Sequence, residues 1–73
     1  MKKIEISIMD IIERMEENEG YITVIEDTKE KTIEAKLLLY EFEIGDITKI
    51  NYIIETGDIE ILLNSRKMLV QML

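Results

Sequence analysis

A chain of 73 residues without cysteine or histidine has no disulfide, and it lacks the commonest metal ligand and the commonest general base. The 47% hydrophobic content is enough for a folded protein, so we expect a single small domain over residues 1–73. Of the 16 acidic and 9 basic residues, eight acids and one base lie between Glu5 and Asp27, so this segment carries the whole net charge of −7. Because such a negative field repels phosphate and anionic lipid, we expect no direct nucleic-acid binding and no membrane partner.

The first residues show no export or membrane signal. Glu5 and Asp10 interrupt the apolar stretch that a signal peptide needs, and the longest apolar run, Leu37 to Tyr40, is too short to cross a bilayer. We therefore expect a cytoplasmic protein. Residues 2–7 alternate weakly between apolar and polar, and either a short edge strand or a lead-in to a helix fits them.

A helix is predicted from Ser7 to Asn18. Four apolar residues follow helical spacing there, namely Ile8, Ile11, Ile12 and Met15. Ser7 and Asp10, three residues later, are typical of a capping box, with Asp in place of the usual Glu or Gln. Gly20 is placed to end the helix in a left-handed conformation.

The opposite face of this helix is acidic. Asp10, Glu13 and Glu17 fall together on it, and Glu16 lies beside them. Glu16, Glu17 and Glu19 are near the negative end of the helix dipole, where acidic residues are unfavourable. Either simple solvation or an external partner has to account for them, and most acidic faces of this kind only keep a small protein soluble.

Residues 20–26 predict a strand, because they are rich in β-branched and aromatic side chains. Residues 28–43 fit two structures. A strand is favoured, because apolar and polar residues alternate from Ile33 to Leu39 and the phase then slips by one residue, as at a β-bulge. The alternative is a second helix, opened by a capping box and supported by the high helix propensity of the segment.

Two Gly-Asp pairs, Gly45-Asp46 and Gly57-Asp58, divide three alternating runs between Tyr40 and Leu63. Because Gly and Asp suit tight turns, we expect two hairpins in series, which form an antiparallel meander with one apolar face. A repeat that builds a binding site is the other interpretation, but hairpin turns explain the spacing without it.

The chain end is conspicuously apolar. After an Asn64 or Ser65 cap we expect a short helix with apolar residues at Met68, Leu69, Met72 and Leu73. These residues must pack on the sheet or on another molecule, so we expect them to mediate self-association as a homodimer. The predicted fold is α+β, with one N-terminal amphipathic helix packed on an antiparallel sheet of about four meander strands, followed by a short apolar C-terminal helix or tail.

No catalytic, cofactor or metal site is predicted. Ser7 and Ser65, the only serines, have no histidine partner, and the sequence contains neither a calcium-binding loop nor a phosphate-binding glycine motif. Paired carboxylates such as Glu13 and Glu17 on an exposed helix suit solvation better than acid–base catalysis. We therefore expect a protein that is not an enzyme.

The leading hypothesis for the function is a small binding or inhibitory protein whose acidic face (Asp10, Glu13, Glu16 and Glu17) acts on a basic protein surface. It would mimic nucleic acid by competing for Arg and Lys that hold phosphates, and its size and composition suit an accessory protein of a phage or mobile element. The alternative is a structural or assembly subunit that homo-oligomerises through its apolar C-terminus or a sheet edge. A small β-barrel that binds nucleic acid is disfavoured, because the chain has no basic stripe.

Overall fold

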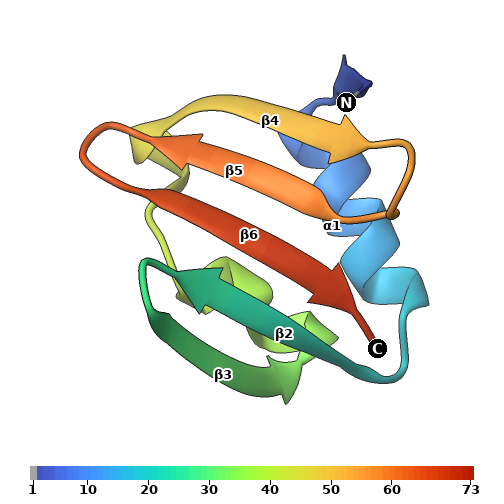
Figure 1. Ribbon diagram of the computed structural model, residues 1–73. Helices are drawn as coiled ribbons and strands as arrows, with labels where there is room; N and C mark the ends of the chain where they lie inside the picture. Colours follow the sequence, from blue (N-terminus) through green and yellow to red (C-terminus); the bar gives the residue numbers. More distant parts are fainter. Residues whose placement is uncertain (1) are drawn as a thin grey trace.

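The computed structural model describes residues 2–73 and has an α+β fold with a six-stranded antiparallel sheet (Figure 1). The strands are β1 (Lys3–Glu5), β2 (Tyr21–Glu26), β3 (Lys29–Glu34), β4 (Ile47–Ile53), β5 (Ile59–Leu63) and β6 (Lys67–Met72). The helices are α1 (Ile8–Glu17) and two short 3-10 helices, η1 (Ala35–Tyr40) and η2 (Ile44–Asp46). The α+β class is as predicted, but the sheet has six strands rather than about four.

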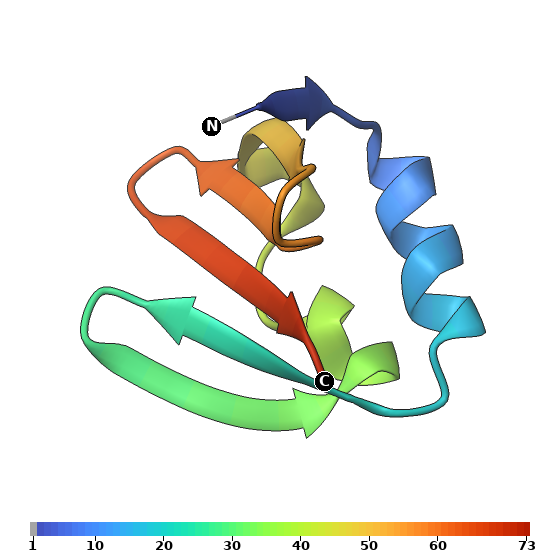
Figure 2. The ribbon, with the colours of Figure 1, turned by 45° about the vertical axis from the view of Figure 1, so that its right-hand side comes forward.

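The strand order is β1-β4-β5-β6-β2-β3, so the last strand of the chain joins the β4–β5 hairpin to the β2–β3 hairpin. The sheet is curled, and α1 and η1 lie against the same face of it (Figure 2). In the part of the chain that the structure describes, no helix covers the opposite face. This opposite face is called the open face below.

The core fills the space between the helices and the covered face of the sheet. Its fully buried side chains come from α1, η1 and the three strands β2, β5 and β6 and are Ile11, Ile22, Leu38, Ile59, Ile61, Met68 and Val70. On β5, Ile59, Ile61 and Leu63 point into the core as their alternation predicted. Alternation therefore identifies the buried face correctly where the strand itself is correctly predicted.

The N-terminal helix is confirmed, together with its capping box. The Ser7 side chain accepts a hydrogen bond from the Asp10 backbone N–H at 3.2 Å, and the Asp10 carboxylate accepts one from the Ser7 backbone N–H at 3.0 Å. The left-handed cap at Gly20 is wrong. Asn18 ends the helix in an extended conformation, and its Oδ1 accepts a hydrogen bond from the Gly20 N–H at 2.8 Å. The side chain of Asn18 thus fixes the turn that leads from the helix into β2.

Both predictions for residues 28–43 are wrong in part. A strand forms, but it ends at Glu34, and η1 follows in place of a bulged strand or a long α-helix. Ala35 and Leu38, three residues apart on η1, are both buried, while Tyr40 is 83% exposed. A 3-10 helix has three residues per turn, so packing of this one face on the core overrides the local alternation.

The two Gly-Asp pairs have different structures. Gly57-Asp58 closes the β4–β5 hairpin as predicted, with Gly57 at φ 77°. The predicted hairpin at Gly45-Asp46 is wrong, because these residues belong to η2 and lead into β4. The element directly before η2 is η1 and not a strand, so β4 has no preceding strand with which to form a hairpin there.

The predicted C-terminal helix is also wrong. Residues 67–72 form β6, which pairs with β5 on one side and with β2 on the other. Met68 and Val70 are buried and alternate with Lys67, Leu69 and Gln71, an arrangement that the helical interpretation of the same apolar residues overlooked. For residues 2–7, the sequence allowed either an edge strand or a lead-in to the helix. The edge strand is confirmed, because β1 pairs with β4.

Candidate functional site

The acidic face of α1 lies on the outside of the molecule because the helix buries the opposite side. Ile11 and Met15, one turn apart, are 0% and 2% exposed and hold the helix on the core. Helical geometry then turns the acidic residues outward, and Glu13, Glu16 and Glu17 are all exposed. The structure therefore brings these three predicted site residues together on one surface.

Asp10, the fourth predicted residue, differs from the other three. Its carboxylate accepts hydrogen bonds from both the backbone N–H and the hydroxyl of Ser7, at 3.0 and 3.1 Å. The backbone bond and then the hydroxyl bond from Ser7 lower the pKa of Asp10, because both stabilise its ionised form. Asp10 is still exposed, but its negative charge already stabilises the positive N-terminal end of the helix.

Glu13, Glu16 and Glu17 have no ion pair with any cation in residues 2–73. Five of the nine cations are paired elsewhere, and the pairs are Lys3–Glu60, Lys31–Glu41, Lys36–Glu34, Arg66–Glu26 and Lys67–Glu60. The uneven charge along the sequence is therefore also uneven in space. α1 carries four acids and one base, whereas these ion pairs lie on the sheet, on η1 and in the turns.

Arg14 is the one basic residue of α1, and it points away from the acidic row. Its guanidinium lies 4.7 Å from the centroid of the Tyr52 ring on β4. A contact of this kind is a cation–π interaction, typically worth about 0.5–1 kcal/mol at an exposed site. Arg14 thus ties the helix to the sheet, while the carboxylates remain on the solvent side.

One exposed apolar residue shares the outer face of α1, and the sequence interpretation missed it. Met9 is 58% exposed and stands one turn before Glu13 on the helix. It sits beside Ile8 in sequence but belongs to the other side of the helix, because neighbouring residues are 100° apart. Because Met9 lies outside the apolar stripe of the helix, its exposure could have been predicted from the sequence. An apolar side chain next to carboxylates is common in surfaces that bind another protein.

The four residues predicted to mediate self-association are divided by the structure. Met68 is 1% exposed and belongs to the core, so it cannot contact another molecule. Leu69 is half-buried on the open face, because it lies between two inward-facing residues of β6. Met72 and Leu73 are exposed, and the Leu73 N–H donates to the Tyr21 carbonyl at 3.3 Å.

A buried ionic cluster lies on the open face, although no helix covers it. Glu60 of β5 is only 8% exposed and accepts hydrogen bonds from Asn51 of β4 at 3.1 Å and from Lys3 of β1 at 3.0 Å. The Asn51 bond and then Lys3 lower the pKa of Glu60 against an opposing effect of burial. Because the Glu60 carboxylate has its hydrogen-bond partners within the sheet, we assign the cluster a role in stability and not in binding.

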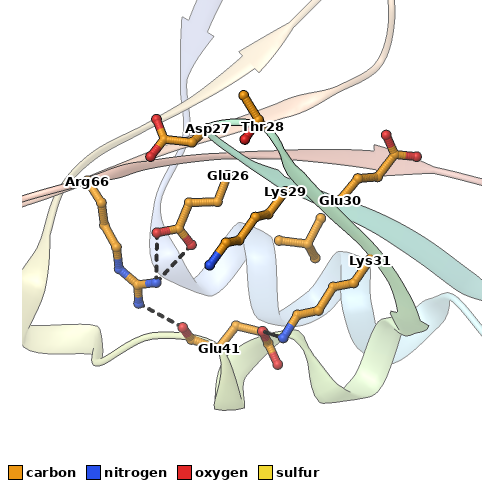
Figure 3. Close-up of a pocket in the computed structure, with 9 residues that line it drawn as sticks. Glu26, Asp27, Thr28, Lys29, Glu30, Lys31, Glu41 and Arg66 are labelled. Atoms are coloured by element: carbon orange, nitrogen blue, oxygen red, sulfur yellow. Dashed lines mark hydrogen bonds and ion pairs between the residues drawn. The ribbon is translucent and has the colours of Figure 1, made fainter.

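A pocket of about 690 Å³ lies between the β2–β3 turn and the β5–β6 turn (Figure 3). Its lining is mostly charged. Arg66 donates to Glu26 at 2.9 Å and to the Glu41 carbonyl at 2.8 Å, and Lys31 pairs with the Glu41 carboxylate. These contacts hold the segment after η1 to both turns. They leave Asp27 and Glu30 exposed at the rim.

No protein-family model, curated protein or solved structure matches this chain. Within residues 2–73 no three His, Cys, Asp or Glu side chains are arranged to hold a metal ion. The described helices are also too short and too polar for any of them to cross a bilayer.

Proposed function

We propose that the protein is a small, non-enzymatic binding protein that inhibits its partner by docking the exposed carboxylates of α1 on a basic protein surface. The observation that carries the proposal is the imbalance of ion pairs. Glu13, Glu16 and Glu17 have no cation partner in the described chain, while five cations, Lys3, Lys31, Lys36, Arg66 and Lys67, pair with acids outside α1. A surface with unpaired charge of one sign attracts the opposite charge and speeds its association.

The helix also presents these carboxylates in a rigid row. Glu13 and Glu17 are one turn apart, which is a rise of about 6 Å along the axis. The capping box and the two core residues fix the orientation of α1. Arg and Lys that hold phosphates can pair with such a row, so the protein would compete with nucleic acid for a basic channel, as an accessory protein of a phage or mobile element would.

The position of the acidic residues supports a role beyond solubility. Glu16 and Glu17 lie in the last turn of α1, at the negative end of the helix dipole. An acidic side chain there typically lowers helix stability by about 0.3–1 kcal/mol. Solubility could be obtained from carboxylates elsewhere on the surface, whereas a continuous charged row requires them on this helix.

Self-association, the alternative proposal, has less support. Met68 is buried, and Met72 and Leu73 together with Tyr21 offer only a small exposed apolar group. A standard interface buries about 800 Å² on each partner, more than these three side chains supply.

The test uses affinity capture from a lysate of the source cells, with three immobilised proteins. These are the wild type, a triple variant with Glu13→Gln, Glu16→Gln and Glu17→Gln, and a matched control with Glu5→Gln, Glu43→Gln and Glu55→Gln. Both variants remove three exposed carboxylates, and in the control the glutamine at position 55 keeps an acceptor oxygen for the Lys2 backbone N–H that Glu55 binds. Circular dichroism checks that all three are folded.

We expect one protein with a basic surface to be retained by the wild type and the control, but not by the triple variant. Its retention should fall sharply between about 0.1 and 1 M salt, since the screening length shortens from about 10 to 3 Å. Equal retention by the triple variant and the wild type would refute a role for α1.

A further inference from the structure

The sheet has a free edge at β3 that the sequence interpretation did not anticipate. β3 is the outermost strand and pairs only with β2, over six residues and without a register shift (Figure 1). It contains no Pro and no bulge, and its two lysines, Lys29 and Lys31, alternate with the residues that face outward. The edge is therefore regular enough to pair with another extended chain.

The register decides which backbone groups are free. The Ala35 N–H donates to the Gly20 carbonyl at 3.1 Å, directly after β3. Because hydrogen-bonded and non-bonded pairs alternate in an antiparallel ladder, Lys29, Lys31 and Ile33 direct their backbone groups to β2. The N–H and C=O groups of the alternate residues, Glu30, Thr32 and Glu34, therefore point away from the sheet.

These three outward residues discourage pairing between two copies of the chain. A full-length antiparallel ladder between two β3 strands would be centred on Thr32, because only outward residues can exchange hydrogen bonds. That register places Glu30 directly opposite Glu34 of the second copy, twice per dimer. Like charges directly opposite each other are destabilising in a sheet. A different chain with basic residues at these positions would instead find two opposite charges.

A pocket adjoins each end of the same edge, and the two pockets differ in charge. Glu34 lines a pocket of about 230 Å³ with Glu16 and Glu19 at the end of α1, and these three acids outnumber its one cation, Lys36. Glu30 lies at the rim of the pocket of about 690 Å³, where four acids face Lys29, Lys31 and Arg66 and the charge is nearly balanced (Figure 3). The pocket at Glu34 connects the β3 edge with the acidic face of α1, so both surfaces belong to one negative region.

We infer that the β3 edge binds an extended basic segment of the partner protein as a seventh, antiparallel strand. The segment carries Lys or Arg at two positions four residues apart, opposite Glu30 and Glu34, with an uncharged β-branched residue between them opposite Thr32. The inference deepens the proposed function and rests on it, because it names the part of the basic partner that is held. Strand addition of this kind obtains affinity from backbone hydrogen bonds and specificity from side-chain pockets.

The geometry sets the length of the segment. Residues four apart in a strand are separated by about 14 Å, so the two basic side chains reach both Glu30 and Glu34 only if the segment stays extended. The Lys36–Glu34 ion pair, at 3.1 Å, does not prevent this, because the Lys36 side chain is 74% exposed and exchanges readily with another cation.

The test measures binding of a synthetic peptide by fluorescence anisotropy at low salt. The probe is an end-capped peptide of alternating threonine and valine with two lysines four positions apart. We expect it to bind the wild type, and the double variant Glu30→Gln with Glu34→Gln to weaken binding about fivefold or more. The control, Glu43→Gln with Glu55→Gln, removes the same charge away from β3 and should leave the affinity within about twofold.

Two further measurements separate strand pairing from general charge attraction. A peptide with the same side chains but N-methylated backbone groups facing β3 should not bind, since it cannot complete the ladder. In the protein, Thr32→Pro removes an outward N–H that β2 does not use, and it should also abolish binding while the amide spectrum remains folded. Should Thr32→Pro fail to fold, the Gln variants and the methylated peptide decide the question alone.

Equal binding of the normal and N-methylated peptides, or equal loss in the Glu30/Glu34 and control variants, would overturn the inference. The α1 triple variant separates this failure from failure of the proposed function. If that variant loses the captured partner while the Glu30/Glu34 variant keeps it, the acidic helix is the docking surface and the strand addition is wrong. If both variants keep it, both proposals are wrong.

Discussion

The Asn51 side-chain amide donates a hydrogen bond to Glu60 at 3.1 Å across the β4–β5 ladder, on a face of the sheet that no described helix covers. The two residues are direct cross-strand partners, and Lys3 joins them from β1. The edge strand β1 is therefore attached to the sheet by an ionic contact in addition to its three-residue ladder.

Glu60→Gln should destabilise the protein by about 1–2 kcal/mol, because hydrogen bonds to a partly buried charged group are stronger than neutral ones. The effect should depend on pH. The folded-state pKa of Glu60 lies below its ordinary value of about 4.5, so its stabilising contribution is present above that pH and is lost as the pH falls through the folded-state pKa. Urea unfolding at pH 7 and pH 3 should therefore show a difference between wild type and variant that narrows in acid. A difference that is constant with pH would contradict this account of Glu60.

Replacing the glycine by alanine should have different effects on stability in the two Gly-Asp pairs. Gly57→Ala should cost roughly 1 kcal/mol or more, because Gly57 has φ 77° and a side chain there is strained. The added Cβ would be 3.7 Å from the Tyr52 hydroxyl, which is an ordinary contact, so the cost arises from the backbone. Gly45→Ala meets nothing within 4 Å and should change the free energy of unfolding by less than about 0.5 kcal/mol. Thermal melting of both variants checks the contrast, which equal losses would contradict.

The stability of the β2–β3 turn can be increased at Asp27, which has φ 57° in a two-residue loop. Glycine adopts this conformation without strain, so Asp27→Gly should raise the free energy of unfolding by about 0.5 kcal/mol. Asp27→Ala should lower it by about 1 kcal/mol, since alanine has neither the freedom of glycine nor a local side-chain hydrogen bond. The order of the three melting temperatures, Gly above Asp above Ala, is the measurement. An alanine variant as stable as the wild type would show that the turn is not strained.

The strand assignment of residues 67–72 can be tested with two apolar truncations. Met68→Ala should cost about 2–4 kcal/mol, because Met68 is in the core. Leu73→Ala should have an effect below about 0.5 kcal/mol, since Leu73 is 75% exposed. Chemical denaturation measures both. Similar costs for the two truncations would contradict the strand assignment.

Local sequence periodicity was sufficient to predict those elements whose structure is determined by their own residues. The helix with Ser7 and Asp10, the β5 alternation and the Gly57 turn are of this kind. The spacing of Met68 and Leu69 fits a helix and a strand equally well. The strand forms because residues 67–72 pair with β5 on one side and with β2 on the other. In the same way, the core selects the buried face of η1 and ends β3 at Glu34.

The candidate site was predictable to the same extent. Helical spacing placed Glu13, Glu16 and Glu17 on one outer face. Their lack of ion pairs could not be foreseen, because it depends on which cations the fold brings near, and those cations pair on the sheet. The outward direction of Glu30 and Glu34 depends on the strand order, which the sequence pattern did not contain.

The place of β6 has a consequence for synthesis of the chain on the ribosome. The β2–β3 and β4–β5 hairpins share no ladder with each other, and only β6 pairs with both. A nascent chain that stops before Lys67 thus holds two separate hairpins and lacks Met68 and Val70 from its core. The two hairpins therefore join only after β6 has been made, and chains terminated before it should be degraded rather than accumulate as partly active fragments.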